Sequence, residues 1–271
     1  MFLKRAMALV KQNIFKIKGK IAGLSFYKIN GKDVVRKSYG PTAQIIKTNP
    51  NYSTVNNNNK EFAGATQLSK AIREGLGSIG KEFQDAYMAS RLTGVCRTII
   101  SNGKGDFGER EANLKANQDK IIGFPLIKNT SLNSLFKTVY NLQISKNQNE
   151  LTISFPGINK SDFLKTKSYT THFKITMIAI CIAPYKYNKK QNKYLPQYKD
   201  SNGISASTST QLLSITQAHR VVSLSINISN RLPATSKINR LVWLGVSTYS
   251  NSNKTKLSLA TQKVMQCISV V

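Results

Sequence analysis

The sequence predicts an α+β fold: an N-terminal β-hairpin and arm with a helical hairpin, followed by a C-terminal antiparallel β-sandwich of about seven strands. The prediction depends on an Asn-Gly turn between alternating apolar residues, two stretches with apolar residues three and four apart, and a final half rich in short β-branched runs. Residues 1–57 are expected to form a basic β-hairpin and extended arm, 58–120 a helical hairpin and polar linker, and 121–271 the sandwich.

The first part is organised around residues 18–37, KGKIAGLSFYKINGKDVVRK. Asn30-Gly31 suits a type I′ turn, because both central residues of that turn need positive φ and Asn-Gly adopts it at least cost. The apolar run at 14–17 predicts a third strand. Such a small sheet must pack on another element, and we expect the helices that follow to cover it. Residues 41–59, with proline, serine and four consecutive asparagines, predict a loop or extended arm.

The chain is strongly basic, with a net charge of +28 and a pI near 10.1. Residues 1–40 carry ten Lys and Arg against one acid, Asp33, a balance of +9. This charge favours a polyanion partner, although lysines spread along a chain also form solvated surfaces or reflect A/T-rich coding. The expected contact residues, for a polyanion or a neighbouring subunit, are Lys18, Lys20, Phe26, Tyr27, Lys28, Lys32, Arg36 and Lys37.

Two helices are expected at about 58–76 and 81–101, because each stretch places its apolar residues on one face. The glycines of GLGSIG, at 75–80, are expected to end the first helix, and Asn102-Gly103 the second. The polar joint at 103–119 holds four of the twelve acids, which serve either as a solvated linker or as a contact for basic surface of a neighbouring subunit.

From residue 121 onward, short apolar runs between turns predict the strands of the sandwich. Serine and threonine alternate with leucine, isoleucine and valine, which is typical of strands buried on one face only. Trp243 lies within such a run and is expected in the core. The runs span 121–127, 142–145, 151–155, 172–183, 211–215, 221–229, 241–249, 257–260 and 264–271.

The composition argues against an enzyme. Acid–base catalysis needs paired titratable groups in one cleft, yet residues 121–271 hold three acids and the chain two histidines, His172 and His219. We expect both histidines to make hydrogen bonds at strand ends. GLGSIG follows a helix instead of a strand, so it does not indicate a nucleotide-binding loop.

The three cysteines, Cys96, Cys181 and Cys267, are far apart and lie in apolar runs. They are expected to be buried apolar side chains. Neither a disulfide framework nor a metal-ligand spacing is present, so we expect no cofactor and no metal.

No targeting segment is expected. The apolar run after Lys4 and Arg5 is shorter than a signal-peptide core of roughly 7 to 15 residues, and no apolar run approaches the roughly 18 residues of a membrane span. The expected location is the cytoplasm, or a particle assembled there.

Several stretches resemble a group of uncharacterised proteins from Bacteroidota genomes. They are the hairpin at 18–36, EFAGATQLSKAIR at 61–73, DAYMASRLT at 85–93, THFKI at 171–175 and LVWLGVSTYS at 241–250. The resemblance implies the same layout of hairpin, helices and sandwich and a role that is not enzymatic, and it supplies no catalytic residues.

Two functions remain open. The first is a structural protein that assembles with copies of itself, into a homo-oligomer, filament or phage-like particle, through the N-terminal arm and exposed sheet edges. The second is a protein that binds DNA or RNA without reading sequence, with the lysines of the hairpin on phosphates and Phe26 and Tyr27 stacking on bases.

Overall fold

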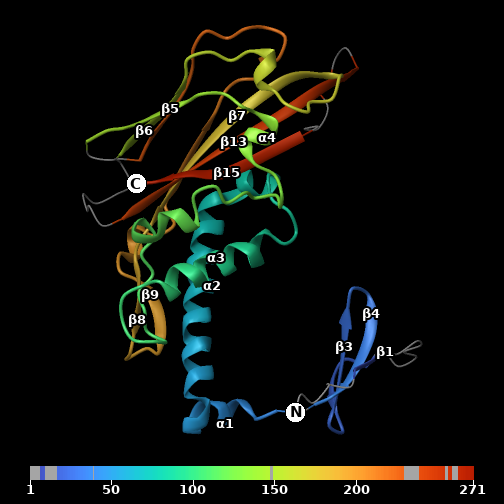
Figure 1. The fold of residues 1–271 in the computed structure, drawn as a ribbon, viewed down its shortest axis with the longest axis vertical. Coiled ribbons are helices and arrows are strands. Elements are labelled where there is room, and N and C mark those ends of the chain that lie inside the picture. Colours follow the sequence, from blue (N-terminus) through green and yellow to red (C-terminus); the bar gives the residue numbers. More distant parts are fainter. Residues whose placement is uncertain are drawn as a thin grey trace. The chain divides into compact units, whose positions relative to one another are not determined.

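The computed structural model describes residues 7–9, 17–38, 40–146, 149–228, 238–253, 256–257 and 262–271. It confirms the α+β class, with N-terminal strands, a long helix and C-terminal antiparallel sheets (Figure 1). The chain divides into two compact units, Met1–Asn56 and Asn57–Val271.

The first unit contains a four-stranded antiparallel sheet in the order β1-β4-β3-β2. Its strands are β1 (Met7–Leu9), β2 (Gly19–Ile21), β3 (Leu24–Ile29) and β4 (Lys32–Lys37). The predicted type I′ turn is confirmed, since φ is 49° at Asn30 and 79° at Gly31. A similar turn at Ala22-Gly23, with φ of 48° and 75°, joins β2 to β3. Alanine rarely adopts positive φ, which is why the sequence did not indicate this turn. Of the strand expected at 14–17, residues 14–16 lie outside the described residues.

The loop or arm predicted at 41–59 is wrong. This segment contains α1 (Ala43–Thr48), the 3₁₀ turn η1 (Pro50–Tyr52) and the start of α2 (Ser53–Glu82). Its polar side chains cap these helices: Thr42 Oγ1 accepts a hydrogen bond from Ile45 N (3.3 Å) and Asn49 Oδ1 accepts one from Asn51 N (2.9 Å). Asn56 Nδ2 donates to Ile46 O (2.6 Å). The residue types that suggested a loop therefore serve as helix caps.

The two predicted helices are confirmed as α2 and α3 (Met88–Ser101), but the glycines do not end the first one where expected. Helix α2 continues to Glu82, and Gly77 alone departs from helical geometry, with φ 61° and ψ −154°. At Gly75 a Cβ atom would lie 2.3 Å from Ile180 Cγ2. Gly75 therefore allows the helix to lie close to a strand.

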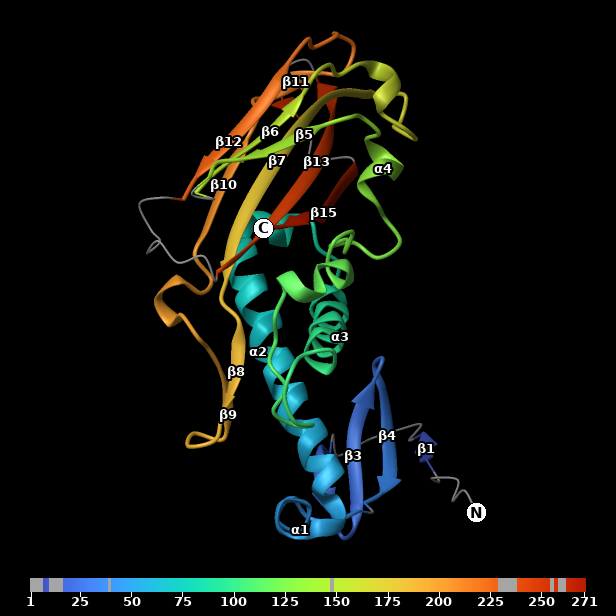
Figure 2. The same ribbon diagram turned by 60° about the vertical axis from the view of Figure 1, so that its left-hand side comes forward.

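The second unit contains the predicted sandwich, made of a three-stranded and a six-stranded sheet (Figure 2). The smaller sheet has the order β12-β6-β5, with β5 (Asn141–Ile144), β6 (Glu150–Phe155) and β12 (Val222–Asn227). The larger sheet contains β7 (Thr170–Ile182), β10 (Ser205–Ser209), β11 (Leu213–Ser214), β13 (Asn239–Asn253), β14 (Lys256–Leu257) and β15 (Gln262–Val270). Side chains from both sheets form one core between them, including Ile153, Phe155, Phe173, Val242 and Leu244.

The helices form a third layer on the other face of the larger sheet. Leu68 and Leu92 belong to the same core as Ile178, Ile180 and Trp243. Trp243 is fully buried as predicted. The apolar face of the helices therefore packs against the larger sheet of the second unit. The expectation that this face covers the N-terminal strands was wrong.

This third layer also corrects the predicted burial of the strands. Strands β7 and β13 are buried on both faces along most of their length, whereas β6 and β12 alternate between buried and exposed residues. The predicted burial on one face only is thus correct for the three-stranded sheet and wrong for the larger sheet. Strands of a sheet covered on both faces carry apolar residues in near-continuous runs, as in ITMIAICIA at 175–183.

Other segments complete the unit. Residues 121–127, predicted as a strand, form turns that bond to β15, with Gly123 N donating to Cys267 O (2.8 Å) and Leu126 N to Met265 O (2.9 Å). The hairpin of β8 (Tyr185–Asn188) and β9 (Lys193–Pro196) was not predicted, because lysine and asparagine obscure its pattern. The short helices are η2 (Lys115–Lys120), α4 (Leu132–Leu135), η3 (Lys160–Asp162) and η4 (Lys199–Ser201).

The close approach at Gly75 gives a test of this packing. Gly75→Ala should destabilise the protein by about 1–3 kcal/mol, because the added methyl overpacks the contact with Ile180. The matched change Gly94→Ala, in α3, meets no heavy atom within 4 Å. It should stabilise by about 0.5–1 kcal/mol through helix propensity alone. Urea unfolding of the three proteins measures both, and equal effects of the two substitutions would contradict the packing.

Candidate functional site

The eight contact residues predicted from the sequence lie on or beside three strands of the N-terminal sheet, but on both of its faces. Because side chains alternate along a strand and paired residues share a face, the registers Lys20↔Ser25, Ser25↔Arg36 and Tyr27↔Val34 define one face. This cationic face carries Lys20, Tyr27, Lys32 and Arg36. The opposite face carries Phe26, Lys28 and Lys37, and Lys18 directly precedes β2.

The centre of the cationic face contains buried residues and a cation–π contact. Ser25 and Val34 are buried there, at 8% and 5% exposure. The guanidinium carbon of Arg36 lies 5.4 Å from the centroid of the Tyr27 ring, within the range of a cation–π contact. Tyr27 thus has an arginine on its ring, and the face presents positive charge around an aromatic centre.

The opposite face carries contiguous apolar side chains, and we call it the apolar face. Ile21 pairs with Leu24 and Phe26 with Val35 across neighbouring strands. Ile21 is 53% exposed and Leu24 38%, while Phe26 and Val35 are half-buried. The charged residues beside them include Lys28 and Asp33, whose side chains form an ion pair at 3.5 Å.

The edge strand β2 is poorly suited to strand addition. It has three residues, all exposed, with Lys20 at its centre and Lys18 just before it. Short edge strands that carry lysine are a common protection against pairing with another chain. The faces of the N-terminal sheet are therefore better contact surfaces than this edge.

Three of the four acids of the joint at 103–119 have partners in the chain. Glu109 carboxylate oxygens lie 3.7 Å from Lys60 Nζ and 3.1 Å from Lys189 Nζ. Glu111 pairs with Lys186 at 3.4 Å, and Asp119 with its neighbour Lys120. These pairs leave little acidic charge for the basic surface of another subunit.

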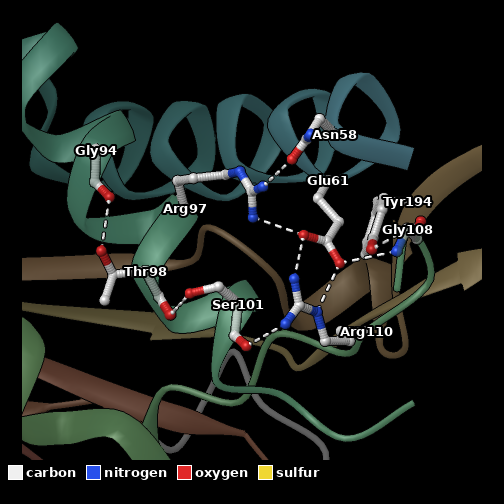
Figure 3. Close-up of polar contacts among 9 residues, drawn as sticks. All are labelled: Asn58, Glu61, Gly94, Arg97, Thr98, Ser101, Gly108, Arg110 and Tyr194. Carbon is white, nitrogen blue, oxygen red and sulfur yellow. Dashed lines mark hydrogen bonds and ion pairs between the residues drawn. The ribbon is translucent and has the colours of Figure 1, made fainter. Parts of the chain in front are cut away.

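A buried polar cluster centred on Glu61 was not predicted (Figure 3). Glu61 lies in α2 and its side chain has no exposed surface. Its carboxylate accepts hydrogen bonds from Arg97 Nη1 (2.5 Å), from Arg110 Nε (2.7 Å) and Nη2 (2.8 Å), and from Gly108 N (2.9 Å). The cluster joins α2, α3 and the polar joint.

Further bonds hold the two arginines and the backbone of the joint in place. Arg97 Nη2 donates to Asn58 Oδ1 (2.8 Å), and Arg110 Nη1 to Ser101 O (2.5 Å). Gly108 has φ 96°, and a Cβ there would lie 2.6 Å from Asn57 Oδ1. Only glycine suits this position without strain.

The electrostatics of the cluster are those of a structural ion pair. Burial raises the pKa of Glu61, but hydrogen bonds from Arg110 and Gly108 and the charges of both arginines outweigh it, so the pKa lies below its ordinary value. A catalytic base needs a pKa near the working pH and an accessible lone pair. Glu61 has neither, so it acts as a clamp on the joint.

A second clamp is formed by Asp85, between α2 and α3. Its carboxylate accepts hydrogen bonds from Lys128 N (2.6 Å), Tyr87 N (2.8 Å) and Arg91 Nη2 (2.9 Å). The bond from Lys128 contributes most to lowering the pKa of Asp85. Arg91 also donates to Pro125 O and Leu126 O, at 2.9 Å each. This clamp attaches the start of α3 to the segment beside β15.

The remaining titratable candidates have structural surroundings. All three cysteines are buried, as predicted, and burial raises the pKa of the Cys96, Cys181 and Cys267 thiols to about 12, 11 and 12. His219 Nε2 donates to Ser214 O (2.8 Å), and His172 Nδ1 lies 2.8 Å from Thr171 Oγ1. Both histidines thus make the expected hydrogen bonds.

Within the part of the chain that the structure describes, no three His, Cys, Asp or Glu side chains are grouped to hold a metal ion. None of the helices in those same ranges combines the length and hydrophobicity needed to cross a bilayer.

Comparison with known proteins finds no family model, no curated protein and no solved structure that matches the chain.

The Glu61 clamp gives a pH-dependent test. At pH 7 Glu61→Gln should destabilise by about 3 kcal/mol, because two buried ion pairs lose their carboxylate. Since the folded pKa of Glu61 lies below its ordinary 4.5, the stabilisation is complete above that value and is lost as pH falls through the folded pKa. The difference between variant and wild type should therefore narrow toward pH 3.

The control is Glu74→Gln, also in α2, whose side chain is 65% exposed beside Lys70. It should change stability by less than about 0.5 kcal/mol at any pH. Urea unfolding at pH 7, 5 and 3 measures both variants. A Glu61→Gln penalty that stays constant across this range would contradict the role given to the carboxylate.

Proposed function

We propose that this chain is a non-enzymatic structural protein that assembles with copies of itself in the cytoplasm, into a homo-oligomer or a larger particle such as a phage-like shell. The observation that carries the proposal is the apolar face of the N-terminal sheet. Contiguous exposed apolar side chains on a soluble unit are typical of an interaction site, and a small sheet gains stability by packing this face.

The charged residues on the apolar face are compatible with a second copy as the partner. Asp33 is the one acid of residues 1–56, and it lies on this face next to Lys28. Lys37 lies on the same face, opposite Leu24 in the register. In a two-fold contact, the acid of each copy would offset lysines of the other, while the apolar side chains are buried between them.

The sandwich and the two clamps support the same role. Glu61 and Asp85 hold connecting segments rigidly to the helices, which suits a body that carries contacts at fixed positions. The Glu61 carboxylate accepts four hydrogen bonds and the Asp85 carboxylate three, so both contribute to rigidity.

The subunit contact is tested by a double substitution on the apolar face, Ile21→Ser with Leu24→Ser. A two-fold contact contains these side chains from both copies, so the variant loses four apolar side chains from the interface. At about 1.5 kcal/mol each or more, self-association should weaken roughly 10,000-fold. The control is Ile29→Ser, which is also exposed (45%) in β3 but faces the other side. Sedimentation velocity on the full chain should show dissociation of the double variant only, and equal association of all three proteins would overturn the proposal.

Nucleic-acid binding is a second candidate, favoured by the cationic face. Lys20, Lys32 and Arg36 share that face, and no acid lies with them among the described residues of β2, β3 and β4. Such a surface would hold phosphates without reading bases, and its affinity would fall steeply with salt.

A matched pair of variants tests this candidate. Lys20→Gln with Lys32→Gln removes two charges from the cationic face, and Lys28→Gln with Lys37→Gln removes two from the apolar face. If phosphates bind the cationic face, the first pair of substitutions should make log K for duplex DNA depend less steeply on log salt concentration. The loss of two phosphate contacts corresponds to a slope change of about 1.8. The second pair should change it little. Equal effects of the two pairs would mean that DNA is attracted by net charge alone, and would contradict binding at the cationic face.

A further inference from the structure

The outer face of the three-stranded sheet differs from the rest of this basic chain. Along β5, β6 and β12, the residues that alternate with the buried ones point outward. They are Asn141, Gln143, Glu150, Thr152, Ser154, Ser223, Ser225 and Asn227. Among these strand residues there is no lysine or arginine, although the chain holds 40 of them. We call this surface the uncharged face.

Two polar bonds join neighbouring strands on this face. Thr152 Oγ1 and Ser225 Oγ are 2.8 Å apart, and Asn227 Nδ2 donates to Glu150 Oε1 (3.0 Å). Glu150, the one charged residue, is thereby tied to a neighbouring strand. Within the outward residues of these strands a polyanion would meet this carboxylate and no cation, and the exposed cations Lys137, Lys146 and Arg220 lie beyond the strand ends. The centre of the face therefore does not suit nucleic acid.

At one end the uncharged face becomes apolar. The bridge Ile158↔His219 continues the β6–β12 register and places Val221 opposite Pro156. The bond from Thr138 Oγ1 to Gly157 O (3.3 Å) continues the β5–β6 register and places Val139 on the other side of Pro156. Val139 is 77% exposed and Val221 70%, and Pro156 is also exposed. Extending the two registers thus places three exposed apolar residues side by side, just beyond the ends of the three strands.

We propose that this face, with its row of Val139, Pro156 and Val221, packs against the same face of a second copy of the chain. The inference rests on the proposed self-assembly and adds a second contact to it. A copy with a charge of +28 can approach another most closely where lysine and arginine are absent, because like charges in contact are strongly unfavourable. Two flat sheet faces pack well at roughly 10 Å.

This second contact is small. The eight outward strand residues and the three residues of the row, at about 33 Å² of sheet each, cover roughly 360 Å² per copy, less than half of the roughly 800 Å² per partner of a stable interface. The contact is therefore weak alone and effective only between copies already joined through the N-terminal apolar face. Two different two-fold contacts on one subunit link copies into an open chain, whereas either contact alone stops at a dimer.

The experiment uses charge variants of the nuclease-treated full chain. Val139→Lys with Val221→Lys and, separately, Val139→Glu with Val221→Glu each place like charges in the contact. The control, Tyr87→Lys with Ile122→Lys, adds the same charge at exposed apolar residues elsewhere (72% and 41%). Sedimentation velocity at about 0.15 M salt should show species larger than a dimer for wild type and control. Each charge variant should stop at the dimer, and an equimolar mixture of the two should restore the larger species.

The outcomes separate this inference from the proposed function. Charge variants that assemble like wild type would overturn the second contact and leave the first in place. A mixture that fails to restore assembly would assign the face to a different occupant and also overturn it. A wild-type chain that is monomeric at every concentration would remove the proposed function itself, and this inference with it.

Discussion

The pairing of β7 with β13 is the constraint on which the second unit depends. These two long strands are buried on both faces, by the three-stranded sheet on one side and by α2 and α3 on the other. The helices need this sheet to bury their apolar side chains. The sheet needs the helices because its own isoleucine and tryptophan side chains project from the second face and must be buried. Gly75 marks a close approach of the two layers, because a side chain there would overlap Ile180.

Charge is the second constraint. Most acids of the polar joint form ion pairs with lysines of the same chain, and Glu61 and Asp85 form ion pairs with arginines. The excess of positive charge is therefore unbalanced within the monomer. Any contact between copies must lie where cations are few or offset, and both the apolar face of the first unit and the outer face of the sandwich meet that condition. The cationic face does not, which is why it suits a polyanion better than another copy.

Local patterns predicted much of the fold. Asn30-Gly31 determined the hairpin, because few other dipeptides tolerate two positive φ values. Helical periodicity found α2 and α3, and β-rich runs found the longer strands. The ends were less predictable. The stretch at 49–59 looked like a loop, yet Asn49 caps η1 and its four consecutive asparagines lie within α2. Gly75 looked like a helix end, yet it allows a close contact with Ile180. The third layer could not be predicted, because periodicity shows that a helix has an apolar face but not what covers it.

The sequence predicted the hairpin on which the eight proposed contact residues lie, but not the face of the sheet to which each belongs. The eight hairpin residues are where expected, yet strand alternation divides them between two faces with different chemistry. The Glu61 cluster was missed because its members are 36 and 49 residues apart in sequence, and no local pattern joins them. The one available signal was an acid among apolar positions on the buried side of α2. Similarly, the uncharged face is visible only once β5, β6 and β12 are known to be neighbours.

The most direct test of self-assembly is the molar mass of the nuclease-treated wild-type chain, by size-exclusion chromatography with light scattering at about 0.05 and 1 M salt. At the higher salt the Debye length is roughly 3 Å, so repulsion between basic copies is screened while apolar contacts remain. The account predicts an oligomer that contains no nucleic acid and persists or grows at high salt. A 30.1 kDa monomer at high salt, with larger species seen only at low salt and only with bound nucleic acid, would contradict it.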